Sequence, residues 1–303
     1  MVALRDVTLR DGLQDETPIS TEHKVAILEL LLAAGVTDLE LTSFTRPDRV
    51  PAMADADRLA ELALGSPARM WGLVLNLRGA ERALAAGIRN LQFVLSVSEP
   101  HNLENTGRSV EESLNELRAI VALAESSGAQ IEATLATAFG CPFVGQVDPS
   151  AVLAVAIRAR ELGVERMSLA DTIGAAVPTE VASLVAQTTA VAEPSELGVH
   201  LHDTRGLAIA NAFAAIDAGA DRLDGTVGGL GGCPFAPGAS GNLPLEDLVH
   251  ALNAMGQPTG IDLDILLEAS ALACSLVDRA PTSHVAVAGP RFARTATAAG
   301  TRS

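Results

Sequence analysis

The chain has 303 residues, of which 48% are apolar and 19% charged, so it can bury one large core. Its net charge of −16 argues against nucleic acid as a partner, because phosphate binding requires clustered basic side chains. The three cysteines, Cys141, Cys233 and Cys274, lack the C-x-x-C spacing of zinc and redox sites, and no apolar run is long enough to span a membrane. We therefore expect a cytoplasmic protein that binds neither nucleic acid nor membranes.

Short β-like runs alternate with helical segments along the chain. The predicted strands cover residues 2–9, 38–41, 69–75, 90–95, 130–135, 166–169, 197–201 and 222–226. Segments with helical periodicity lie between them, for example at residues 21–34, 109–126, 149–162, 178–190 and 207–218. Several helices end on a small residue and a glycine before the next strand, as in AAGVTDLEL and ELGVERMSL. The repeated unit is therefore a strand followed by a helix.

About eight such units predict an α/β fold, the (β/α)8 TIM barrel. A doubly wound open sheet is the alternative, and it is disfavoured because no G-x-G-x-x-G motif opens a helix after the first strand. Additional C-terminal helices are predicted at residues 245–254 and 263–280. We expect a catalytic barrel with this helical extension over residues 1–285, and a flexible tail at residues 286–303.

Polar side chains stand where the predicted strands end, which is where active sites of such barrels lie. Arg10 and Asp11 follow the first strand, and Glu40 closes the second. Asn76 follows the third strand and Asp171 the sixth. Loops after strands are often polar only because they cap helices, which is the structural alternative for this set.

The segment VHLHDT places His200 and His202 on one face of a strand, because side chains alternate with a period of two. Two imidazoles at a strand end suit a divalent cation, although His-x-His also occurs with both rings hydrogen-bonded in a core. The carboxylate of Asp11 and the amide carbonyl of Asn242 would complete a mixed nitrogen and oxygen set. Such a set favours Mg²⁺ or Mn²⁺, and its imidazoles also admit Zn²⁺, Co²⁺ or Fe²⁺.

Cys233 lies in the glycine-rich stretch GLGGCPFAPGASGN, at residues 229–242. A structural cysteine prefers a packed apolar site, whereas this one is surrounded by residues that give the backbone freedom. The stretch therefore indicates either a chemical role for the thiol or a hinge.

Taken together, the motifs resemble those of the 3-hydroxy-3-methylglutaryl-CoA (HMG-CoA) lyase family, which are DRE-TIM metallolyases. They are TLRDGLQDE at residues 8–16, ELTSF at 40–44, FGCPF at 139–143, ADTIG at 170–174, HLHDTRG at 200–206 and the stretch at 229–242. They occur in the family's order along nearly the whole chain. The related isopropylmalate and citramalate synthases share the R-D-G and H-x-H motifs, but their equivalent loop lacks the cysteine.

The resemblance implies a metal-dependent lyase that cleaves HMG-CoA to acetoacetate and acetyl-CoA. The implied ligands of a Mg²⁺ or Mn²⁺ ion are Asp11, His200, His202 and Asn242. Arg10 would lie beside the thioester carbonyl, and Cys233 would be a mobile acid and base. Glu40 and Asp171 would complete the polar shell of the catalytic site, together with His200.

The resemblance also implies an acyl-CoA partner. Asn76, Arg46, Arg49 and Arg78 near the barrel mouth are candidates for binding coenzyme A, although each arginine can equally be an ordinary surface charge. Thr134 stands where the family commonly has tyrosine, which leaves open a related 3-hydroxyacyl-CoA or hydroxy-oxoacid as the substrate of a lyase or aldolase. We expect a homodimer. A non-catalytic binding barrel is a further alternative, but it has no need of the metal set and the cysteine.

Overall fold

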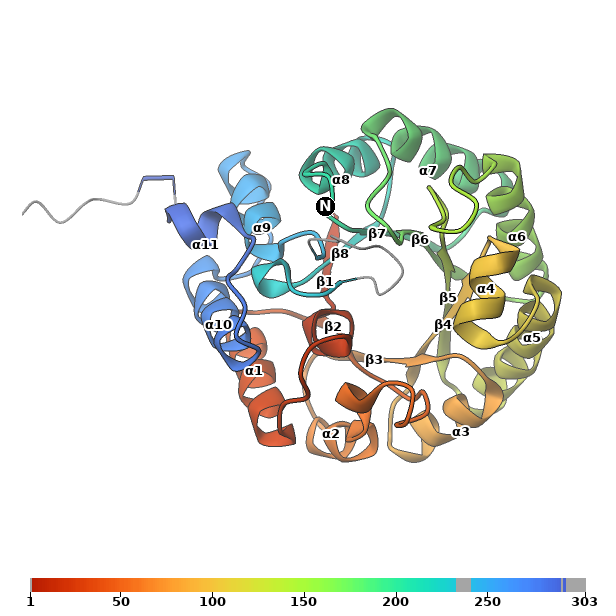
Figure 1. Ribbon diagram of the computed structural model, residues 1–303, viewed down its shortest axis with the longest axis horizontal. Coiled ribbons are helices and arrows are strands. Elements are labelled where there is room, and N and C mark those ends of the chain that lie inside the picture. The colour runs from red at the N-terminus through yellow and green to blue at the C-terminus, as the bar shows by residue number, and fades with distance from the viewer. Residues whose placement is uncertain (1, 233–240, 290, 293–303) are drawn as a thin grey trace, which may run out of the picture.

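Eight parallel strands close into a barrel in chain order, with β8 hydrogen-bonded to β1. The computed structural model describes residues 2–232, 241–289 and 291–292. The strands are β1 (Ala3–Asp6), β2 (Asp38–Ser43), β3 (Arg69–Val74), β4 (Asn90–Ser96), β5 (Gln130–Ala136), β6 (Arg166–Asp171), β7 (Glu196–Leu201) and β8 (Arg222–Gly225). The predicted (β/α)8 TIM barrel is confirmed (Figure 1).

Helices surround the barrel and cover its apolar outer face. They are α1 (Thr21–Ala33), α2 (Ala56–Leu62), α3 (Leu77–Ala85), α4 (Glu99–Thr106), α5 (Val110–Ser127), α6 (Pro149–Glu161), α7 (Pro178–Ala192), α8 (Ala208–Asp217), α9 (Leu245–Ala254), α10 (Leu263–Leu276) and α11 (His284–Ala288). Because α10 packs against α1 and α9, the C-terminal helices fill the position after β8 and close the ring (Figure 1).

Most element boundaries differ from the predicted ones by a few residues, and two of the differences matter for the site and the tail. Helix α11 ends at Ala288, inside the tail predicted to begin at residue 286, and residues 293–303 lie outside the described ranges. The first strand was predicted over residues 2–9, but β1 ends at Asp6. The chain then forms a π-helical turn, η1 (Thr8–Gly12), in which Gly12 N donates to Val7 O at 3.1 Å. Arg10 and Asp11 therefore lie in this turn and not at the end of a strand.

The Asp6 side chain explains why the strand ends early. Its two carboxylate oxygens accept from the Thr8 backbone N–H at 2.9 Å and from the Thr8 hydroxyl at 2.8 Å. This local bonding competes with extended backbone and bends the chain after Asp6. The Thr8 hydroxyl also accepts from Val227 N at 2.9 Å, which ties the turn to η3 (Val227–Gly229) after β8.

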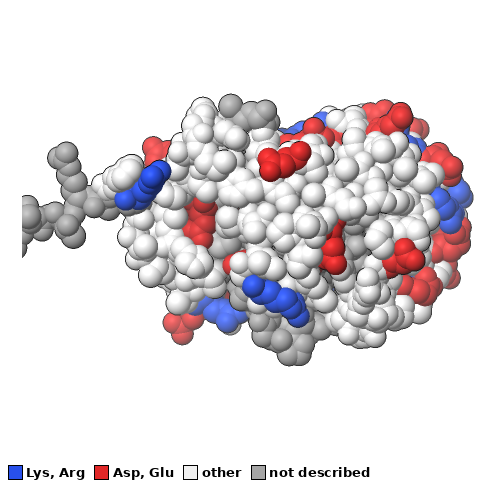
Figure 2. Space-filling model, turned by 90° about the horizontal axis from the view of Figure 1, so that it is seen from above, with Lys and Arg blue, Asp and Glu red and all other residues white. Residues whose placement is uncertain are grey.

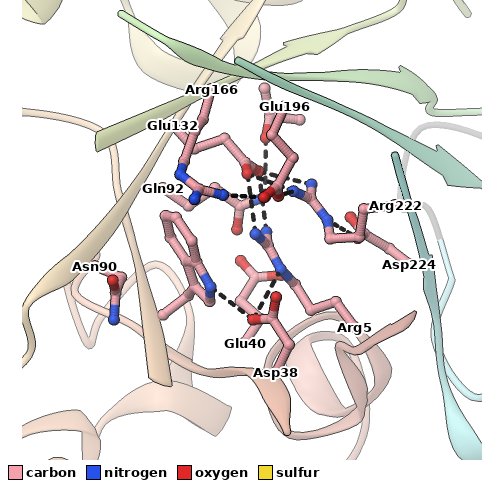
Figure 3. Close-up of polar contacts among 12 residues, drawn as sticks. Arg5, Asp38, Glu40, Asn90, Gln92, Glu132, Arg166, Glu196, Arg222 and Asp224 are labelled. Carbon is pink, nitrogen blue, oxygen red and sulfur yellow. Dashed lines mark hydrogen bonds and ion pairs between the residues drawn. The ribbon is translucent and has the colours of Figure 1, made fainter. Parts of the chain in front are cut away.

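Charged side chains fill the part of the barrel interior away from the C-terminal ends of the strands, where apolar residues are usual (Figure 3). Arg5 and Arg222 both bind the buried carboxylate of Glu132, through contacts of 2.9 and 2.9 Å and of 2.7 and 3.0 Å. Gly198 leaves room for this cluster, because a Cβ there would lie 2.2 Å from Arg222 Nη2. Such buried pairs offset their desolvation only when every partner is present, so losing one partner costs about 3–5 kcal/mol.

The strand register places Glu40, Gln92, Ser168 and Asp224 in one layer, contributed by the even-numbered strands. Trp71 and Glu132 lie in the layer below it, and the Arg5 guanidinium stacks 4.3 Å from the centre of the Trp71 ring. The layer that contains Glu40 and Asp224 is therefore a polar floor between the charged cluster and the end of the barrel where the predicted site lies.

Candidate active site

Asp11, His200 and His202 converge at the C-terminal end of the barrel, and all three are buried. Asp11 Oδ2 lies 3.5 Å from His202 Nε2 and 3.6 Å from His200 Nε2. The two Nε2 atoms are 3.1 Å apart. Two imidazole nitrogens and a carboxylate oxygen that face a common point are the donor set of a divalent cation.

Asn242 lies beside this cluster because its backbone forms an isolated bridge with His202. Its Nδ2 donates to Asp11 Oδ2 at 2.7 Å and to Leu230 O at 2.9 Å. Its Oδ1 is buried and has no hydrogen-bond partner among the described residues. A buried amide oxygen without a donor, next to a carboxylate, fits a hard cation such as Mg²⁺ or Mn²⁺. The structure thus brings together the four residues that we predicted as metal ligands.

Arg10 lies between two carboxylates. It donates to Asp11, and its Nη2 donates to Glu40 Oε2 at 2.7 Å. Burial lowers the pKa of Arg10, but Asp11 and Glu40 raise it more, so the guanidinium stays charged. Burial raises the pKa of Glu40, and Arg10 opposes that rise. The site therefore holds a fixed cation immediately beside the candidate metal ligands.

Two further predicted residues make local backbone contacts. Asp171 accepts from Ala175 N at 2.9 Å and from Ala176 N at 3.0 Å, so it fastens the loop that follows β6. Asn76 accepts from Gly79 N at 2.8 Å and caps α3. These contacts correspond to the structural alternative given above, in which polar residues after a strand cap the next loop or helix.

The three arginines predicted to bind coenzyme A, Arg46, Arg49 and Arg78, are all exposed. Arg46 is exposed and its Nε donates to Asp48 at 3.0 Å. Arg49 lies in the turn after Arg46 and donates its backbone N–H to that residue's carbonyl at 2.9 Å, and Arg78 is the second residue of α3. Cys233 lies outside the described residues, so the structure gives it no position. Cys141 and Cys274 are buried free thiols.

Sequence reasoning missed two floor residues that support the site. The Gln92 amide lies between the Glu40 carboxylate and the Thr134 hydroxyl, 2.8 Å from the hydroxyl oxygen. With its nitrogen toward Glu40, it donates to the carboxylate and accepts from Thr134. Asp224 lies beneath His200, with 3.6 Å between Asp224 Oδ2 and His200 Nδ1. Their inward-facing positions on β4 and β8 are the sequence signal that could have identified these two residues.

Buried acids also anchor the π-helical turn. Asp6 binds Thr8 as described above, and Glu246 Oε1 accepts from Gly228 N at 2.7 Å in η3, to which the turn is tied. Burial raises the pKa of Asp6 to about 7 and that of Glu246 to about 7. The turn that carries Arg10 and Asp11 therefore rests on carboxyl groups that stay protonated up to about pH 7.

These acids predict a pH dependence of stability. The pKa of Glu246 is about 7 in the folded protein and its ordinary value is 4.5, so the folded state binds more protons between these values. The contribution of Glu246 to the free energy of unfolding should therefore be largest below about pH 4.5. It should fall as the pH rises to 7 and be lost above the folded pKa.

Glu246→Gln should flatten this fall by about 1 kcal/mol per pH unit, because its amide oxygen can still accept from Gly228 without ionising. Urea unfolding at pH 5, 6, 7 and 8 measures the slope, with the exposed Glu104→Gln as control. A Glu246→Gln variant with the slope of the unchanged protein would contradict the prediction.

Comparison with known proteins agrees with this geometry. The HMGL-like family model matches residues 1–273. The chain is 40% identical to a (R)-citramalyl-CoA lyase of Chloroflexus aurantiacus, over 96% of each chain. It is 38% identical to a hydroxymethylglutaryl-CoA lyase of Bacillus subtilis, over 89% of this chain and 91% of that one.

A solved HMG-CoA lyase of Acinetobacter baumannii, in complex with coenzyme A and 3-methylmalate, is similar with a TM-score of 0.93 and 37% identity, over 97% of each chain. None of the helices in the described ranges combines the length and apolar character of a membrane-spanning segment. The match of the family model over most of the chain, together with these full-length similarities, shows that the chain belongs to the HMGL-like family.

Proposed function

We propose that this protein is a divalent-metal-dependent carbon–carbon lyase that cleaves HMG-CoA to acetoacetate and acetyl-CoA. The observation that carries the proposal is the position of Arg10, a buried cation in contact with Asp11 of the Asp11–His200–His202 cluster. Relatives similar over most of the chain are named as lyases of short branched acyl-CoA thioesters. The active-site geometry and the family membership support the same reaction class.

The reaction needs an acidified alcohol and a place for negative charge. A divalent cation held by Asp11, His200, His202 and Asn242 would acidify the tertiary hydroxyl and orient the acyl chain. Arg10 would stabilise the enolate that develops on the thioester oxygen when the carbon–carbon bond breaks. Glu40 holds the Arg10 guanidinium in place at 2.7 Å, and the Gln92 amide holds Glu40. Asp171 would shape the rim through the loop that it fastens.

The Cys233 thiol is the proposed acid that protonates the enolate carbon, on the strength of the sequence alone. Cys233→Ser should keep Mn²⁺ and acyl-CoA binding but lose most cleavage, because a hydroxyl has a far higher pKa than a thiol near 8.5. Steady-state kinetics and coenzyme A binding measured on one preparation separate the two effects. Cys274→Ser, which alters a buried thiol in α10, is the control. Turnover within about threefold of the unchanged protein would remove the thiol from the mechanism.

Citramalyl-CoA is a second candidate substrate. The 40% identical relative is named for it. Thr134, hydrogen-bonded to Gln92 of the polar floor, stands where the family commonly has a tyrosine. Citramalyl-CoA is one methylene shorter than HMG-CoA, so its carboxylate is attached to the carbinol carbon. Discrimination between the two therefore depends on contacts to that carboxylate, and one methylene alone is worth only about 1–3 kcal/mol.

Product analysis separates these substrates. The Mg²⁺- or Mn²⁺-loaded protein is incubated with each thioester and the products are identified by mass spectrometry. Acetoacetate with acetyl-CoA from HMG-CoA supports the proposal, and pyruvate with acetyl-CoA from citramalyl-CoA at a higher kcat/KM supports the second candidate. Absence of acetyl-CoA from both thioesters, with metal bound, would refute a lyase of this kind.

Coenzyme A is polyanionic, so its binding needs basic groups on an acidic protein. On the face shown in Figure 2, the described Lys and Arg side chains do not merge into one patch and are accompanied by acidic ones. We propose that individual residues at the mouth, Arg46, Arg49 and Arg78 with Asn76, contact the coenzyme. Cytoplasmic location and a homodimer remain predictions from the sequence.

A further inference from the structure

Asp224 occupies the polar floor directly beneath a candidate metal ligand. It is fully buried on β8, and its Oδ2 lies 3.6 Å from His200 Nδ1 with no hydrogen-bond partner among the described residues. The other nitrogen of the same ring, Nε2, faces Asp11 and His202. His200 therefore has a carboxylate behind it and the cation position in front of it.

The charged cluster fixes the Asp224 carboxylate (Figure 3). Asp224 Oδ1 accepts from Arg222 Nε at 2.9 Å. Arg222 is held in turn by Glu132 at 2.7 Å and by Glu196 at 2.6 Å. Glu132 and Glu196 hold the Arg222 guanidinium in place. Asp224 therefore cannot turn away from it without leaving its own buried negative charge unpaired. Oδ2 thus stays directed at the His200 ring.

We propose that Asp224 is a positioning residue for His200. A carboxylate can only accept, so His200 keeps its proton on Nδ1, and the Nε2 lone pair is left free for the cation. The 3.6 Å separation is longer than a hydrogen bond, and a small rotation of the imidazole closes it. The inference rests on the proposed metal site and is independent of which thioester is cleaved.

Asp224→Asn is the test variant, because it keeps the size of the side chain. If the new amide oxygen accepts from Arg222 Nε, the NH₂ group faces His200 Nδ1. Because an NH₂ group donates, it favours the His200 tautomer with its proton on Nε2. That proton occupies the nitrogen at which the cation should bind. Mn²⁺ affinity, measured from the electron paramagnetic resonance signal of free Mn²⁺, should fall about 10- to 100-fold.

Glu196→Gln is the matched control. Glu196 binds the same Arg222 guanidinium at 2.6 Å but forms no hydrogen bond or ion pair with His200 among the described residues, so this variant should lose stability and keep its Mn²⁺ affinity. Urea unfolding of both variants measures the stability. Equal weakening of Mn²⁺ binding in both, or unchanged binding in Asp224→Asn, would overturn the proposal. A wild-type protein that binds no Mn²⁺ would overturn the metal site itself, and this inference with it.

A second measurement needs no Asp224 variant. Nitrogen-15 NMR of the metal-free protein with labelled histidines, at pH 8, reports which nitrogen of each ring carries the proton. The His200 signal is assigned by its loss in His200→Gln. We expect the neutral His200 ring to carry its proton on Nδ1, and a neutral ring with its proton on Nε2 would refute the role of Asp224 even if Asp224→Asn failed to fold.

Discussion

Arg10→Met is expected to lower kcat by about 10²- to 10³-fold and to leave Mn²⁺ affinity unchanged or slightly higher. The guanidinium would stabilise charge that develops on the thioester oxygen only as the bond breaks, so its loss raises the barrier more than it weakens substrate binding. Arg10 also donates to Asp11, and a methionine frees that carboxylate from its counter-ion. Metal binding should therefore not suffer.

Steady-state kinetics and Mn²⁺ titration of the same preparation test this result. Arg158→Met is a matched control, because Arg158 is an exposed arginine whose Nη2 donates to Glu111 at 2.9 Å on the outer helices. Its kcat should be unchanged. If Arg10→Met lost Mn²⁺ while its unfolding transition stayed intact, Arg10 would be a support for Asp11, and its contribution to the chemical step would have to be withdrawn.

The barrel could be predicted because its signals are local. The eight strands and the longer helices can each be recognised within about ten to twenty residues, and a glycine such as Gly35 or Gly163 adopts the positive φ that ends the unit. The His200 and His202 pair followed from strand alternation alone. Closure of the barrel was predicted from the number of repeats, whereas the packing of α10 against α1 was not.

The charged interior and the floor could not be predicted in this way. Arg5 and Glu132 are 127 residues apart, and Arg222 and Glu132 are 90 apart, so only the closed register brings them together. The π-helical turn was missed because residues 7–9 look like a strand, and the bond from Asp6 to Thr8 that bends the chain is a side-chain effect. Gln92 and Asp224 carry no motif, and their importance depends on the neighbours that the fold supplies.

The sequence also does not distinguish which partners the polar side chains at the strand ends meet. Asp171 and Asn76 resemble Glu40 in the sequence, since each closes or follows a strand. In the structure, Glu40 binds Arg10, whereas Asp171 and Asn76 accept from the backbone of the next loop or helix. The difference depends on whether a side chain meets a partner from another strand or a free N–H of its own loop, and a single sequence does not contain that information.

His202→Ala is expected to abolish specific Mn²⁺ binding and turnover while changing the free energy of unfolding by only about 1 kcal/mol. Its Nε2 is one of three converging donors, and with one lost, the remaining carboxylate and imidazole hold a cation weakly. His202 Nδ1 has no hydrogen-bond partner among the described residues, so no internal bond is broken on that side. The bridge to Asn242 is made by backbone and survives the substitution.

His23→Ala, on the exposed face of α1, is the control for losing a histidine anywhere in the chain, and it should keep full metal content and activity. Mn²⁺ content after gel filtration, kcat, and the urea midpoint are measured on both variants. Near-normal turnover of His202→Ala in the presence of a chelator would show that cleavage proceeds without the cation. Loss of folding in His202→Ala would instead show that the ring is part of the barrel's packing. Retained fold with lost Mn²⁺ is the outcome that we expect from the geometry of Asp11, His200 and His202, because their ligand atoms face a common point.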